Sequence, residues 1–149
     1  MQFRGLDALV GLGLLEPKPP DPRRVQTWLD RSRSDLALAR DVVGQVDRDR
    51  AMAIAYEAGF RACVGVLSLA GYRLSSQSGH HRAAIEAAAV VLGQDVRPLL
   101  RRIDGARQFR NEILYGDAPP ASASQLAQLI HDVDDLLGRL SSALDDPCR

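Results

Sequence analysis

The chain has 149 residues, a length that fits one domain able to bury an ordinary hydrophobic core without a metal ion or disulfide bonds. Apolar residues make up 46% of the sequence but aromatic residues only 5%, which favours packed helices over a strand-rich core. The 19 basic and 19 acidic side chains cancel, so no global field attracts nucleic acid or a membrane, and any such attraction has to be local.

The first 20 residues predict a short helix followed by a spacer. Apolar side chains recur at helical spacing at Phe3, Leu6, Leu9 and Val10. The proline-rich segment at residues 16–22, EPKPPDP, cannot continue this helix. We therefore assign residues 1–20 to an N-terminal docking helix and spacer that cover one end of a bundle. Residues 21–149 form the bundle itself, and the two parts make one domain overall.

The next segment predicts the first long helix. Asp21 and Pro22 are residue types preferred at a helix N-cap and in the first helical turn. From Val25 onward, apolar residues return every three or four positions, with arginines and aspartates between them. This spacing predicts an amphipathic helix of about 25 residues.

After a break at residues 44–49, residues 51–74 are apolar on nearly every face, which is typical of a central helix. Gly59 and Gly65 in this run would allow neighbouring helices to approach closely. Cys63 has no basic residue beside it that would lower the pKa of its thiol, so we interpret it as a packing residue.

The rest of the chain predicts further helices. Residues 80–93 form a short alanine-rich helix, and Asp95 can cap the next long one, which stops at Gly116 and the prolines beyond it. The last helix opens near Ser122 or Ser124. Its apolar residues are close to a seven-residue repeat, so it packs either inside the bundle or against a second subunit. No sustained strand pattern interrupts this series, so the fold class is all-α, a single-domain bundle of about five helices.

The compartment and cofactor content are predicted from what the sequence lacks. Cys63 and Cys148 are too few and too different in setting to suggest a disulfide framework, which is typical of a reducing cytoplasm. The N-terminus has no signal-peptide pattern and no stretch reaches roughly 18 apolar residues. No phosphate loop or metal-ligand spacing occurs. We expect a cytoplasmic protein with no membrane association, metal or cofactor.

The most informative stretch is residues 107–115, RQFRNEILY, late in the helix that follows Asp95. Arg107, Asn111 and Tyr115 are four residues apart and share a helix face, whereas Arg110 is rotated by about 100° from Asn111. The segment resembles the signature of the HEPN superfamily of prokaryotic RNA-targeting and toxin–antitoxin proteins. That signature is an arginine, usually followed by asparagine, and a histidine four to six residues further on. Tyr115 stands where the histidine would commonly fall.

The resemblance implies an RNA- or partner-binding protein of a toxin–antitoxin or defence module. Two copies would meet along this helix as a homodimer, with Arg110 contacting phosphate and Asn111 orienting it in a shared cleft. In nuclease members the histidine moves the proton while arginine holds the phosphate. Tyrosine, with a pKa near 10, is a poor base at neutral pH, which favours binding over cleavage. Relatives paired with a nucleotidyltransferase imply that Tyr115 is a candidate modification site.

Two histidines and a group of arginines are further candidates for the site. His80 and His81 could supply the missing proton-transfer group if their loop folds over the Arg110 helix, although positions satisfied by backbone contacts are the plainer interpretation. As adjacent residues they are a weak metal pair. Residues 97–110 contain five arginines and one acidic residue, Asp104. The candidate RNA- or partner-binding residues of this patch are Arg101, Arg102, Arg107 and Arg110.

Alternatives remain open for the patch and for the function. The arginines could instead pair with acidic residues of the last helix, Asp132, Asp134 and Asp135, and Arg110 could pair with a carboxylate such as Glu112. The leading hypothesis is a dimeric RNA-binding protein or the partner of a nucleotidyltransferase or other toxin–antitoxin protein. The first alternative is an active metal-independent endoribonuclease toxin that uses Arg110 with Tyr115 or His80 and His81. The second is a helical scaffold or dimerisation module.

Overall fold

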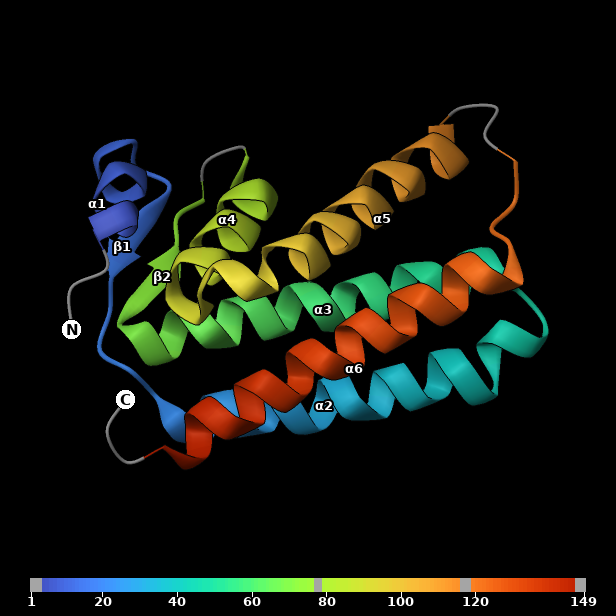
Figure 1. Ribbon diagram of the computed structural model, residues 1–149, viewed down its shortest axis with the longest axis horizontal. Helices are drawn as coiled ribbons and strands as arrows, with labels where there is room; N and C mark the ends of the chain where they lie inside the picture. The colour runs from blue at the N-terminus through green and yellow to red at the C-terminus, as the bar shows by residue number, and fades with distance from the viewer. Residues whose placement is uncertain (1–3, 77–78, 116–118, 147–149) are drawn as a thin grey trace.

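Six α-helices dominate the computed structural model, which describes residues 4–76, 79–115 and 119–146 (Figure 1). The helices are α1 (Arg4–Gly11), α2 (Pro22–Asp41), α3 (Arg48–Ala70), α4 (His80–Leu92), α5 (Arg97–Tyr115) and α6 (Ala123–Asp145). Short 3-10 turns, η1 (Val43–Gln45) and η2 (Gln94–Val96), precede α3 and α5. The predicted all-α class is confirmed, with one more helix than the approximate number expected.

Helix α3 is the centre of the bundle, with α2 and α6 on one side and α4 and α5 on the other (Figure 1). Among the described helices, α3 alone is long and apolar enough to cross a membrane by length and composition, but more than half of that stretch is buried inside the protein. A helix covered on several sides passes this test because it is a core helix. The predicted central position of this segment is confirmed.

Two glycines let other helices approach α3 closely. A Cβ atom built on Gly65 would lie 3.0 Å from Cδ2 of Leu140 in α6 and 3.3 Å from Cγ1 of Val25 in α2. A Cβ atom on Gly59 would lie 3.1 Å from Cγ2 of Val133. These separations are shorter than ordinary van der Waals contact, so a side chain at either position would push α6 away. The predicted role of both glycines is confirmed.

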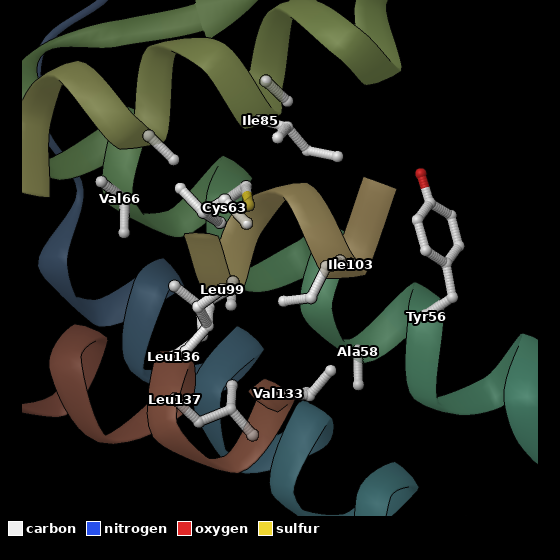
Figure 2. Packing of buried hydrophobic residues seen from close by; sticks show 14 of the residues in the cluster. Tyr56, Ala58, Cys63, Val66, Ile85, Leu99, Ile103, Val133, Leu136 and Leu137 are labelled. Atoms are coloured by element: carbon white, nitrogen blue, oxygen red, sulfur yellow. The ribbon is translucent and has the colours of Figure 1, made fainter. Parts of the chain in front are cut away.

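Helix α6 packs inside the bundle. Its repeat of apolar side chains is buried at Leu126, Leu129, Val133, Leu136, Leu137 and Leu140. Figure 2 shows Val133, Leu136 and Leu137 directed into the shared core, where Ile103 and Leu99 of α5 lie. Of the two arrangements that the repeat allowed, the structure therefore shows the internal one.

Local capping explains where several helices begin. The Asp21 carboxylate accepts a hydrogen bond from the backbone N–H of Arg24 at 3.1 Å, as predicted for the start of α2. Ser122, rather than Ser124, caps α6 and forms a reciprocal capping box with Gln125. Asp95 departs from its predicted capping role because it lies within η2, and its carboxylate accepts a hydrogen bond from Arg139 of α6 at 3.1 Å.

A two-stranded sheet replaces the predicted end of the central helix. Helix α3 stops at Gly71, whose φ of 94° is left-handed backbone that glycine adopts readily. The residues that follow form β2 (Tyr72–Leu74), which pairs antiparallel with β1 (Leu15–Pro17) in the N-terminal spacer. The spacer is extended because its prolines exclude a helix, so its backbone groups are available for pairing.

Helix α1 packs on the outside of α4 (Figure 1). Leu6 is fully buried, and a Cβ atom on Gly5 would lie 3.0 Å from Val90 of α4. The N-terminal segment is therefore attached to the bundle twice, through α1 and through β1.

Candidate nucleic-acid interface

The motif residues Arg110, Asn111 and Tyr115 occupy the last turns of α5, where the sequence predicts them. Their side chains, and that of Glu112, lie outside the described part of the structure. In Figure 1, α5 rises away from α3 toward this end, so the motif lies on the part of α5 farthest from the central helix. The turns of α5 that precede the motif, from Arg97 to Arg107, contact α4 and α6.

Four aromatic and imidazole rings cluster where the start of α4 meets α3. Nδ1 of His81 lies 2.9 Å from the hydroxyl oxygen of Tyr56 in α3, within hydrogen-bond distance. The His81 ring also stacks on Phe60, with centroids 4.3 Å apart and planes inclined by 30°. His80 lies 4.5 Å from His81, centroid to centroid, and meets Phe60 edge to face. These contacts fix both histidines to α3 instead of leaving them in a loop.

This ring cluster lies beside α5. Tyr56 is fully buried, and its burial raises the pKa of its hydroxyl well above the ordinary value. The positive charge of Arg107 on α5 opposes that rise in the pKa. Figure 2 shows the Tyr56 hydroxyl pointing to the side of the core on which α4 lies. His80 and His81 are thus held against α3 at the start of α4, a helix that packs against α5.

The arginines of α5 fall into different environments. Arg102 donates two hydrogen bonds to the buried Asp132 of α6, from Nε at 2.8 Å and from Nη2 at 2.9 Å. Arg107 pairs with Asp104 one turn earlier on its own helix, at 3.1 Å. Arg101 is exposed and has no partner within the described residues. Pairing with the last helix therefore applies to Arg102, whereas Arg101 keeps an uncompensated charge.

Of the other two acidic candidates on α6, Asp135 acts on Arg102 through its charge alone, without a direct ion pair. Asp135 pairs with Arg139 on its own helix at 3.1 Å, and the described part of the chain shows no ion pair for Asp134. His131 is exposed on α6.

A groove of about 230 Å³ runs between α4 and α5. The lining residues are Arg82, Ile85, Glu86 and Ala89 from α4 and Arg97, Leu100, Arg101 and Asp104 from α5. The groove begins one residue after His81, so the ring cluster and the groove are neighbouring parts of one surface.

Sequence reasoning missed three residues of this region, namely Phe60, Arg82 and the buried Tyr56. The two aromatic residues are the only ones in α3 and are spaced four apart, so they share a helix face. That spacing was the available signal, but an aromatic pair in an apolar run is also what a core helix contains. Arg82 follows His81 directly and gave no signal of its own.

The fold and these residues define a class of protein in structural terms: an all-α bundle with arginines and histidines gathered where α3, α4 and α5 meet. No protein-family model matches the chain, and comparisons with curated proteins and with solved structures found no match. The HEPN resemblance stays a prediction from the motif. Within the described residues, no group of three or more histidine, cysteine, aspartate or glutamate side chains is placed to hold a metal ion.

Proposed function

We propose that this chain is a HEPN-type RNA-binding protein of a prokaryotic toxin–antitoxin or defence module, and that it acts as a homodimer. The observation that carries the proposal is that His80 and His81 open α4 directly before Arg82, which lines a groove together with Arg101 of α5. Binding a phosphate chain needs several donors with positive charge close together, and this junction combines guanidinium and imidazole groups from two helices.

The proposed RNA site extends from this junction to Arg110 and Asn111 on the last turns of α5. Arg110 contacts a phosphate, and Asn111 orients the contact. A second copy approaches along the same part of α5, which rises away from α3 (Figure 1). A nucleotidyltransferase or another toxin–antitoxin partner would engage the same face, with Tyr115 as the modification site.

The Arg110→Ala variant is expected to bind a labelled single-stranded RNA at least about tenfold more weakly, because a hydrogen bond to a charged group contributes about 1.5–3 kcal/mol. Fluorescence anisotropy at fixed salt measures the change. Arg31→Ala is the matched control, since Arg31 is exposed on α2 and has no partner in the described chain. Wild-type protein that does not bind RNA, or equal affinities for the two variants, would refute the proposal.

A second candidate function, metal-independent endoribonuclease, is favoured by the hydrogen bond between Tyr56 and His81. This bond holds an imidazole in one orientation, as acid–base catalysis requires. In the reaction, the ribose 2′-oxygen loses its proton and attacks the neighbouring phosphorus. The bond from phosphorus to the 5′-oxygen breaks, and that oxygen takes up a proton. The products are a 2′,3′-cyclic phosphate and a free 5′-hydroxyl end.

Under this second function, the wild-type protein is expected to cleave RNA in the presence of a chelator, leaving cyclic phosphate ends. His81→Ala would lose cleavage while still binding RNA, because the arginines remain. His131→Ala is the control, since this histidine is exposed on α6. Intact RNA after prolonged incubation with wild-type protein rules out the nuclease and leaves the binding function standing.

A further inference from the structure

The groove between α4 and α5 has a cationic rim and an apolar floor. Arg82, Arg97 and Arg101 form the rim. The floor consists of side chains that are almost fully buried, Ile85, Ala89 and Leu100. Such a combination suits a ligand with an anionic end and a flat or weakly polar body, since charged donors fix one part while apolar surface covers the other.

The charges in this groove do not cancel. Glu86 accepts a hydrogen bond from Arg82 at 3.1 Å, and Asp104 pairs with Arg107 at 3.1 Å, so each carboxylate already has its own arginine. Arg97 donates only to the neutral side chain of Gln94, at 2.9 Å. Arg101 has no partner in the described part of the chain. Two guanidinium groups are therefore left to face a ligand.

The spacing of these two arginines matches one phosphate. Arg97 and Arg101 are four residues apart on α5, so they project from the same face about one turn, or roughly 5–6 Å, from each other. Two arginine side chains that start from positions this close can bring their guanidinium groups to different oxygens of the same phosphate. The groove volume of about 230 Å³ accommodates a body of small-molecule size and excludes a helix or folded peptide.

We propose that this groove binds one nucleotide of a single-stranded RNA, with its phosphate between Arg97 and Arg101 and its sugar and base over Ile85, Ala89 and Leu100. The inference rests on the proposed RNA-binding function and extends its footprint along α5. The floor side chains have no polar groups to read a base edge, so the contact is insensitive to sequence. Because α4 and α5 run in opposite directions (Figure 1), the groove leads from the histidines toward the start of α5.

The double variant Arg97→Ala/Arg101→Ala tests the groove through the salt dependence of RNA binding. Removing two phosphate contacts is expected to reduce the slope of log affinity against log salt by about 1.4, at about 0.7 for each contact with a single strand. The reduction should be the same for uridine-rich and adenine-rich RNA. Arg31→Ala/Arg33→Ala is the matched control, since it removes equal charge from exposed positions on α2.

A second measurement separates the groove from the wider function. Uridine 5′-monophosphate is titrated into the wild-type protein while NMR follows the guanidinium Nε–H signals, which are expected to shift for Arg97 and Arg101. If the Arg97→Ala/Arg101→Ala variant binds RNA with an unchanged salt slope, the groove does not bind the RNA, and the proposed RNA-binding function still stands. Shifts at Arg97 and Arg101 without any RNA binding support a nucleotide site and overturn the proposed function. Absence of both overturns both.

Discussion

Replacing Leu140 by alanine is expected to lower the free energy of unfolding by about 2–5 kcal/mol. Leu140 is fully buried where α6 crosses α3, and its Cδ2 atom lies 3.0 Å from where Gly65 would carry a Cβ atom. Because α3 is already close to both α2 and α6 at this point, the helices cannot approach further to fill the space left by the truncated side chain. Urea denaturation followed by circular dichroism measures the loss.

Leu38→Ala is the control for this prediction, because Leu38 is 44% exposed on α2 and its truncation should change stability by only about 0.5 kcal/mol. Gly65→Ala provides a further check. On its own it is destabilising, since the added methyl group meets Leu140 and Val25. In the Leu140→Ala background it should cost less, with a coupling energy of about 0.5 kcal/mol or more. Additive effects would show that α3 and α6 do not meet in this way.

Raising the pH above about 9 is expected to destabilise the protein by about 1.4 kcal/mol per pH unit for each buried acid that titrates. Burial raises the pKa of the Cys63 thiol to about 12. An unfolded cysteine ionises near pH 8.5, so above that pH the unfolded state binds fewer protons than the native state. The contribution of Cys63 is therefore fully present below about pH 8.5 and is lost progressively as the pH rises toward 12.

Tyr56 also lowers the stability of the protein as the pH rises, but it does so at higher pH than Cys63. Burial raises the pKa of the Tyr56 hydroxyl, whereas an unfolded tyrosine ionises near pH 10. The stability that Tyr56 contributes therefore begins to fall near pH 10. Urea midpoints measured between about pH 8 and pH 11 follow both losses. Cys63→Ala should flatten the decline in stability between about pH 9 and pH 10, where Cys63 contributes and Tyr56 does not yet. An equally steep decline in that variant would mean that the Cys63 thiol is not protected by burial.

The positions of the helices could be predicted from the sequence because helix formation depends on neighbours close along the chain. Apolar spacing, the Asp21 and Ser122 caps and the prolines of the spacer act within one or two turns. The role of Gly65 followed from the same local pattern, since a glycine in an otherwise apolar helix leaves room for another helix. The residue pattern of the Arg110–Asn111 motif likewise needs no structure to be seen.

Only the tertiary structure decided which side chains meet. The strands β1 and β2 are each too short to stand out, and they pair across more than fifty residues of chain. The hydrogen bond between Tyr56 and His81 likewise joins two different helices. Neither contact has a local pattern, because each depends on how whole helices pack together.

Arg101 and Arg102 illustrate the physical reason most clearly. They are neighbours in a charged run and look equivalent in the sequence, but on a helix they point about 100° apart. One direction leads to the buried Asp132 of α6, and the other leads to the groove beside α4. The sequence determined that α5 would carry a row of positive charges. The packing of α4 and α6 around that helix determined which charge is neutralised and which one faces a ligand.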